Sequence, residues 1–100
     1  MKVNISRNAA KVLQAELGKP EHEGKKLRVY VTHRHGDHAH YGLALDTPTE
    51  SDVVVTTDKG IDVILDKNEP FLDGVRIDYF YLPQEGFQIT NPSKGSHGDH

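Results

Sequence analysis

Apolar residues near the N-terminus recur at helical spacing. Ser6 is a candidate N-cap, and Gly18 ends the pattern. The apolar positions between them are Ala9, Ala10, Val12, Leu13 and Leu17. This spacing predicts one amphipathic helix of about three turns. The polar stretch that follows, residues 18–26, contains proline and glycine and indicates a loop.

Beyond residue 26 the apolar residues recur at every second position, which is typical of half-buried strands. Leu27, Val29 and Val31 begin this pattern. The alternation recurs at residues 75–81, and further strands are predicted at residues 41–46, 53–57, 61–65 and 86–90. The segment 58–60 ends in glycine, which can adopt the positive φ of a tight turn, so the strands on either side of it are expected to form a hairpin. A short helical turn is predicted around Phe71 and Leu72.

Together these elements predict a compact α+β fold. We expect a mostly antiparallel β-sheet or sandwich with an N-terminal helix and a second, short helix. A chain of 100 residues supports one modest hydrophobic core, so we assign a single domain to residues 1–92. Residues 93–100 contain no hydrophobic side chain, and they are expected to form a flexible tail unless a ligand holds them.

The composition excludes several kinds of protein. The chain has no cysteine, so it cannot by itself supply thiolates to an iron-sulfur cluster or form a disulfide. Its 12 basic and 15 acidic residues are interspersed, without the basic stripe of a nucleic-acid-binding protein. The longest aliphatic run, residues 53–55, is far shorter than a membrane span, and the N-terminus lacks an apolar secretory segment. We therefore expect a cytoplasmic protein that binds neither nucleic acid nor membrane.

Histidine and aspartate gather in two segments that share the sequence HGDH. His33 and His35 are two residues apart, so they would share one face of a continuing strand. Gly36 permits a turn that would bring the next ligands back toward them. The candidate metal ligands of the two segments are His33, His35, Asp37, His38, His40, His97, Asp99 and His100.

The donor set restricts the chemistry. Imidazole nitrogen binds zinc, iron, nickel, cobalt and copper, and carboxylate adds a harder oxygen ligand. Without thiolates, such a site favours one or two divalent ions over a sulfide cluster, and we expect zinc, iron or nickel. Binding by the C-terminal segment would order the tail, because the binding energy offsets the loss of chain entropy. The simpler interpretations are a polar surface loop and a solvated chain end.

Several segments together resemble the A-type iron-sulfur carriers, also called the HesB/IscA-like domain. They are ISRNAAKVLQAEL, LRVYV, SDVVVTTDKGIDVILDK and FLDGVRIDYFYLPQEGFQITNP, of which the last is the most specific. The resemblance covers nearly the whole chain. It implies the α+β fold given above, frequent homodimers, and a role in carrying clusters or iron. Iron-sulfur assembly proteins or metal-delivery proteins would then be the partners.

The sequence departs from this family at the ligands. Family members carry one cysteine after the strand that LRVYV matches, and a cysteine-glycine-cysteine near the C-terminus. Here the first segment reads HRHGDHAHYG and the second reads SHGDH, in which His97-Gly98-Asp99 is the best match. The two HGDH segments therefore fall at the two places that the family uses to bring its ligands together, which makes one shared site geometrically reasonable.

Three functions remain open. The first is a metal-binding protein on the carrier scaffold, acting in iron-sulfur cluster assembly or metal handling. The second is a hydrolase, because THRHGDH matches the THxHxDH motif of metallo-β-lactamase-fold enzymes. Its metal ligands would be His33, His35, Asp37 and His38, but that fold needs a much longer chain, so we assign no catalytic residue. The third is an interaction module that binds no metal.

Overall fold

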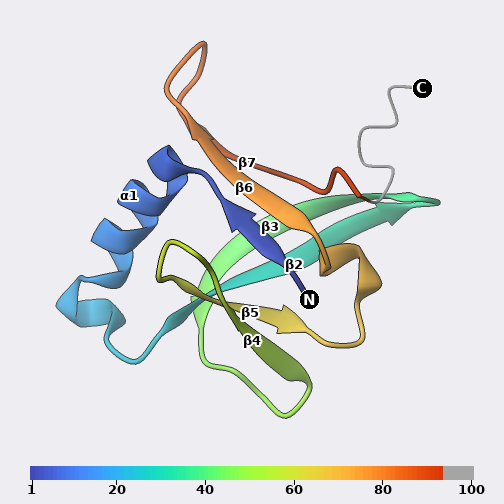
Figure 1. Cartoon of the computed structure of the whole chain (residues 1–100), viewed down its shortest axis with the longest axis horizontal. Helices are drawn as coiled ribbons and strands as arrows, with labels where there is room; N and C mark the ends of the chain where they lie inside the picture. The colour runs from blue at the N-terminus through green and yellow to red at the C-terminus, as the bar shows by residue number, and fades with distance from the viewer. Residues whose placement is uncertain (94–100) are drawn as a thin grey trace.

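The computed structural model describes residues 1–93, which form one α-helix, two short 3-10 helices and seven strands (Figure 1). The helices are α1 (Arg7–Leu17), η1 (Pro20–His22) and η2 (Pro70–Leu72). The strands are β1 (Val3–Ile5), β2 (Lys26–His35), β3 (His38–Asp46), β4 (Asp52–Thr56), β5 (Asp62–Asp66), β6 (Val75–Phe80) and β7 (Gly86–Thr90). His97, Asp99 and His100 lie outside the described residues.

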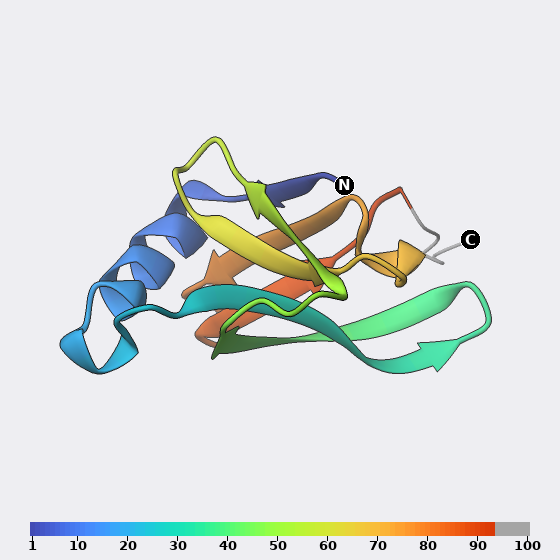
Figure 2. The same cartoon turned by 90° about the horizontal axis from the view of Figure 1, so that it is seen from below.

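The strands form two sheets. One sheet has the order β1-β6-β7, in which β1 is parallel to β6 and β7 is antiparallel to it. The other has the order β3-β2-β5-β4, in which β2 and β5 run parallel and the other pairs are antiparallel. The hairpins β2–β3 and β6–β7 extend in different directions from the centre of the molecule (Figure 1, Figure 2). This arrangement confirms the predicted α+β fold with mostly antiparallel strands.

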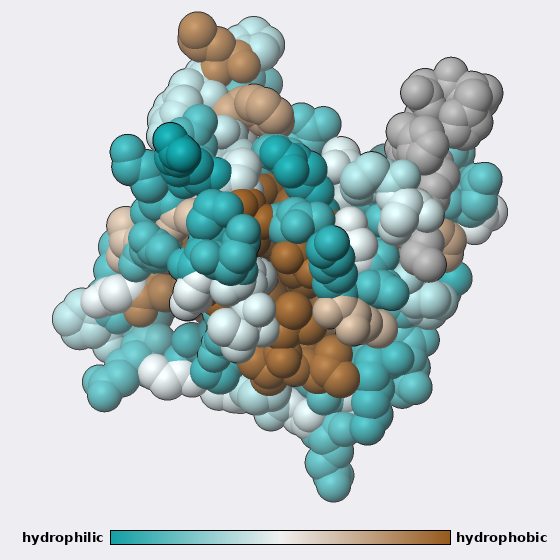
Figure 3. Space-filling model, viewed as in Figure 1, coloured by the Kyte–Doolittle hydropathy of each residue, from teal (hydrophilic) through white to brown (hydrophobic). Residues whose placement is uncertain are grey.

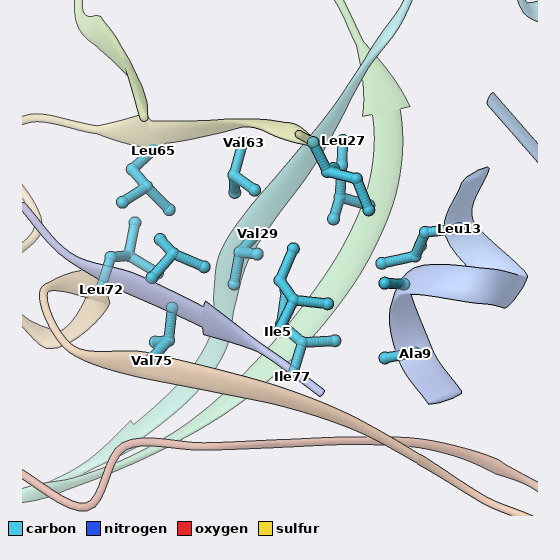
Figure 4. Packing of buried hydrophobic residues seen from close by; sticks show 13 residues of the cluster. Ile5, Ala9, Leu13, Leu27, Val29, Val63, Leu65, Leu72, Val75 and Ile77 are labelled. Carbon is cyan, nitrogen blue, oxygen red and sulfur yellow. The ribbon is translucent and has the colours of Figure 1, made fainter. Parts of the chain in front are cut away.

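Alternate residues of the strands and one face of α1 make the hydrophobic core. The Ser6 hydroxyl accepts a hydrogen bond from the backbone N–H of Ala9 at 3.2 Å, and so caps α1 as the sequence indicates. Burying each large aliphatic side chain here contributes about 1.5–3 kcal/mol. The side chains that point toward one another in Figure 4 include Ile5, Ala9, Leu13, Leu27, Val29, Val63, Leu65, Leu72, Val75 and Ile77.

Ion pairs of Arg28 connect neighbouring strands at one end of the four-stranded sheet. They lie on its outer face, which points away from the core. The guanidinium donates to the carboxylate of Asp46 at 2.8 Å and, through two nitrogens, to that of Asp52 at 3.0 and 2.7 Å. The side chain of Asp52 is only 3% exposed, and the guanidinium holds its pKa well below the usual carboxyl range. These three side chains join β2, β3 and β4.

Some backbone features differ from the sequence-based expectation. β1 has only three residues, too few to show an alternating pattern, and pairs in parallel with β6. β2 continues to His35 and β3 begins at His38, so the first histidine segment lies on two paired strands and not in a surface loop. The β4–β5 hairpin is confirmed, with Gly60 at a φ of 74°.

No helix within residues 1–93 has both the length and the apolar character that a membrane crossing demands.

Candidate metal site on the β2–β3 hairpin

The hairpin that carries the first HGDH segment turns in two residues. His35 is the last residue of β2 and pairs with His38, the first residue of β3, so Gly36 and Asp37 form the turn. Gly36 has a φ of 56°, a conformation that residues with a Cβ rarely adopt. Glycine at the first turn position is what a type II′ hairpin needs, and the turn therefore fixes the register of the histidines.

A β-bulge in β2 determines which way these histidines point. Val31 pairs with Tyr41 and His33 pairs with His40, although Tyr41 and His40 are adjacent. Thr32 is therefore the extra residue of the bulge and has no partner on β3. Val31 and Tyr41 pack against the core. His40 immediately precedes Tyr41 on β3, so its side chain points to the opposite, outer face.

Residues directly opposite one another in an antiparallel pair point to the same face. His33 therefore lies on the outer face with His40, and the next pair in phase, His35 and His38, lies there too. Without the bulge, odd-numbered residues of β2 would have continued on the core face, away from the even-numbered histidines of β3. The four side chains His33, His35, His38 and His40 are called the histidine face below.

The imidazole rings of the histidine face lie close together. The ring centre of His33 is 4.2 Å from that of His35 and 6.2 Å from that of His40, and the His35–His40 separation is 6.0 Å. An imidazole nitrogen lies about 2.0–2.1 Å from a bound zinc, which places the ring centres of two ligands of one tetrahedral ion about 5 Å apart. One observed separation is shorter than this value and the other two are longer. Binding of one ion by all three rings would therefore require rotation about their side-chain bonds.

In residues 1–93 no three histidine, aspartate or glutamate side chains are already arranged to hold a metal ion. Asp37 sits in the turn with its side chain 82% exposed, and one of its carboxylate oxygens is 3.7 Å from Nε2 of His38. This carboxylate is beside the histidine face and not among the three clustered rings. His22, the remaining described histidine, lies elsewhere, with Nδ1 2.8 Å from the carbonyl oxygen of Glu16.

The inner face of the same hairpin is fixed to the body of the protein. Arg34 points inward, where its guanidinium lies 4.8 Å from the ring centre of Phe71 and 3.4 Å from the carboxylate of Glu69. The Tyr41 hydroxyl donates to the carbonyl oxygen of Phe71 at 3.0 Å. The contacts of Arg34 and Tyr41 thus attach the inner face of the hairpin to η2 and to Glu69, the residue before it. The histidine face, on the other side of the hairpin, stays open to solvent.

The chain leaves its last strand beside these contacts. Asn91 is fully buried, and its side-chain amide donates to the carbonyl oxygens of Phe71 at 2.7 Å and Asp73 at 2.8 Å. Its side-chain oxygen accepts hydrogen bonds from the backbone and hydroxyl of Ser93. Gly74 permits this packing, because a Cβ there would lie 2.5 Å from the Ser93 hydroxyl oxygen. The root of the C-terminal segment is thus held at the carbonyl that Tyr41 also contacts.

Comparison with known proteins shows the fold. No family model matches the sequence, and no curated protein matches it. The structure is similar to that of Escherichia coli SufA, which is involved in the biosynthesis of iron-sulfur clusters, with a TM-score of 0.70 and 20% identity over 90% of this chain and 80% of SufA. It is also similar to IscA solved with its [2Fe-2S] cluster, with a TM-score of 0.69 and 24% identity over 91% of this chain and 86% of IscA. The predicted fold is therefore confirmed as that of SufA and IscA.

The donor atoms of this chain do not fit a cluster held by cysteine. The sequence contains no cysteine, so it offers no thiolate at any position. The side chains that the β2–β3 hairpin offers instead are imidazoles, with the carboxylate of Asp37 beside them. THRHGDH, which matches a hydrolase motif in sequence, spans the end of β2, the turn and the first residue of β3.

Proposed function

We propose that this protein binds a divalent transition-metal ion on an iron-sulfur carrier scaffold. The ligands are imidazole nitrogens of the histidine face, with His33, His35 and His40 as the first set and His38 beside them. The observation that supports this most directly is the bulge at Thr32, because it places histidines from both strands on one face.

The chemistry of the donors selects the ion. Imidazole favours zinc, iron or nickel, and the open face leaves coordination positions that water or a further ligand can fill. Protons compete with the metal for each imidazole nitrogen, so we expect affinity to fall as the solution is made acidic. A bound ion would draw the three rings toward the separation of about 5 Å that a common ligand sphere requires.

The C-terminal HGDH segment is proposed to supply additional ligands, namely His97, Asp99 and His100. Ser93 is held by Asn91, whose amide shares the Phe71 carbonyl oxygen with the Tyr41 hydroxyl, and Tyr41 is next to His40. From Ser93, the four residues to His97 span up to about 13 Å when extended. Ser93, four residues before the second segment, is therefore held close to the hairpin that carries the first.

The likeness to SufA and IscA supports a role in iron-sulfur cluster assembly or metal handling. In this proposal the protein receives or delivers a metal ion, and its partners are iron-sulfur assembly or metal-delivery proteins. A homodimer and a cytoplasmic location belong to the same proposal. The absence of thiolates points to transfer of an ion and not to cluster binding by this chain alone.

Metal titration of chelator-stripped protein tests the proposal. We expect stoichiometric uptake of zinc, iron or nickel by calorimetry and elemental analysis, with shifts of histidine resonances on the β2–β3 hairpin. The matched control exchanges two neighbours, Ala39→His with His40→Ala, which keeps the composition and moves one imidazole to the inner face. That variant should bind at least about tenfold more weakly, because one ligand is lost. His22→Ala should bind as the wild type does.

Two results would contradict this function. Failure of all three ions to bind at neutral pH would leave an interaction module without a metal. Metal-dependent hydrolysis that is lost in His35→Ala or Asp37→Ala would instead indicate an enzyme. Truncation after Pro92 tests the second segment separately, since tighter binding by the full chain than by the truncated one assigns ligands to residues 93–100.

A further inference from the structure

The edge strand β4 has a sequence typical of a strand inside a sheet. Val53, Val54 and Val55 form a continuous apolar run, as in strands that are covered on both faces. In the order β3-β2-β5-β4, however, β4 is the outermost strand in the part of the chain that the structure describes. Val54 is 42% exposed, and Val53 and Val55 are only partly buried against the core. Figure 3 shows hydrophobic surface in the region where Figure 1 places β4 and β5.

Hydrogen bonds at both ends of the β4–β5 pair show which backbone groups of β4 face outward. The N–H of Lys67 donates to the carbonyl oxygen of Ser51 at 3.0 Å, and the N–H of Thr57 donates to that of Ile61 at 3.0 Å. In an antiparallel pair, every second residue bonds to the partner strand, and the residues between direct their N–H and C=O to the other side. The odd-numbered residues of β4 therefore bond to β5, and its even-numbered residues direct their backbone groups to the free edge.

The sequence of β4 does not protect this edge from pairing. Edge strands are commonly protected by charged side chains, by proline or by a β-bulge. Residues 53–56 include neither a charge nor a proline, and their register with β5 is regular. The charged residue of the strand, Asp52, is paired with Arg28, and its side chain is 3% exposed. At the opposite edge of the same sheet, histidines and Asp46 interrupt the apolar residues of β3.

We propose that β4 pairs with an extended segment of a partner protein, which adds to the sheet as a fifth strand. Val54 and Thr56 each offer one backbone donor and one backbone acceptor to it. The three valines favour β-branched aliphatic side chains opposite them, because such side chains pack well beside one another in a sheet. This alternation of backbone groups identifies the ligand as an extended chain. One added strand buries less than the roughly 1,200 Å² of a stable interface, so binding is transient.

Charges at the ends of β4 select the ends of the partner segment. Glu50 precedes the strand and Asp58 follows it, and both are exposed. Lys59 lies 3.5 Å from the carboxylate of Asp58 and offsets part of its charge, so Glu50 attracts a cation more strongly. The whole chain has a net charge of −3. A segment with lysine or arginine on either side of its apolar centre is therefore the complementary partner.

Amide hydrogen exchange followed by NMR, with a chelator present, tests this pairing. In the free protein, the amides of Val54 and Thr56 should exchange faster than those of Val53 and Val55. The probe is the acetylated and amidated peptide Lys-Thr-Val-Val-Val-Thr-Lys. At about ten times its Kd it should slow exchange at Val54 and Thr56 about tenfold, and should leave Val53 and Val55 as they are. N-methylation of alternate peptide residues provides the matched control, because only methyl groups that face β4 should abolish binding.

Variants of one residue test the same edge from the side of the protein. Val54→Pro removes an outward donor and keeps the pairing with β5, since proline is tolerated where the N–H of an edge strand faces outward. It should weaken peptide binding about tenfold, whereas Val54→Thr, which keeps the N–H and the β-branched shape, should bind within about threefold of wild type.

Three results would overturn the proposal. The first is unchanged exchange at Val54 and Thr56 when the peptide is present in excess. The second is equal binding of the peptide by Val54→Pro and by the wild type. The third is protection of these amides that grows with protein concentration without peptide, which would assign the edge to a second copy of the chain. Each measurement is made without metal, so it is distinguishable from a failure of the proposed function.

Discussion

Two hairpins extend beyond the hydrophobic core and expose different chemistry. One is the β2–β3 hairpin, and the other is the end of the β6–β7 hairpin, residues 79–88, which is called the aromatic arm because Phe80, Tyr81 and Phe87 are exposed there. In β6 the alternation continues without interruption: Ile77 is buried, and Tyr79 follows on the same face, opposite Phe87. In β2 the bulge at Thr32 interrupts the alternation, so the core face ends and the histidine face begins. Whether the strands of such a hairpin pair regularly or with a bulge therefore decides which side chains continue the apolar face.

The largest expected effect is on stability. The ion pairs of Arg28, on the β2–β3 hairpin, and of Arg76, on the β6–β7 hairpin, should contribute very different amounts to the free energy of unfolding. Arg28 joins three strands and pairs with the nearly fully buried Asp52, whereas Arg76 pairs with Asp78 two residues away on the same strand, at 3.0 Å. We expect Arg28→Ala to lower the free energy of unfolding by about 3 kcal/mol, because it leaves a buried carboxylate unpaired. Arg76→Ala should cost less than about 0.5 kcal/mol. Urea unfolding of both variants measures the difference, and equal losses would contradict this assignment.

Inserting one threonine between His40 and Tyr41 should remove the distinction between the two hairpins, because Thr32 would then have a partner on β3 and the bulge would close. With the register of the turn kept, His33 and His35 would turn to the inner face, and Arg34 would lose Glu69 and Phe71. We expect the free energy of unfolding to fall by about 2 kcal/mol. Metal uptake should be lost with it, as calorimetry would show. Inserting one threonine after Gln84, in the loop of the aromatic arm, is the control, and it should leave metal uptake as it is.

Acid should weaken the ion pair between Arg28 and Asp52 at the root of the β2–β3 hairpin. The pKa of Asp52 is lowered in the folded protein, chiefly by its hydrogen bonds with Arg28, whereas an unfolded aspartate has a pKa of about 3.9. The stability from this pair is therefore fully present above about pH 4, and is lost as the pH falls below that toward the folded pKa. Urea unfolding at pH 6 and at strongly acidic pH should show a gap between wild type and Asp52→Asn that narrows in acid. Asp58→Asn, a change of an exposed side chain, is the control for the substitution itself.

The smallest expected effect is on a single tyrosine of the aromatic arm. The hydrogen bond from the Tyr79 hydroxyl to the carboxylate of Glu85 raises the pKa of Tyr79 to about 12. Glu85→Gln should bring this pKa back toward the ordinary value of about 10, since the negative partner is removed. Ultraviolet titration detects the change, and Tyr79→Phe identifies the signal among the four tyrosines. An unchanged titration in Glu85→Gln would show that this contact does not hold in solution.

Much of the fold could be predicted from the sequence because it follows from local spacing. The helix after Ser6, the β4–β5 hairpin around Gly60 and the strand after residue 86 each carry their own pattern of apolar residues or glycine. β1 could not be found in this way, since three residues show no period and the strand depends on pairing with β6. The parallel pairing of β2 with β5 is likewise a property of the assembled sheets.

The candidate site was only partly predictable for a related reason. That His33 and His35 share a face follows from their spacing, and Gly36 marks the turn. That His40 joins them depends on the bulge, and threonine at position 32 gives no signal of it. Asp37 follows Gly36 in the turn, where its exposed carboxylate lies 3.7 Å from Nε2 of His38.

One carbonyl oxygen, that of Phe71, holds the hairpin through Tyr41 and the end of the last strand through Asn91. Movement of either segment is therefore coupled to the other through this shared acceptor. If the hairpin shifts when it engages a partner, Asn91 and the Ser93 that it holds shift with it.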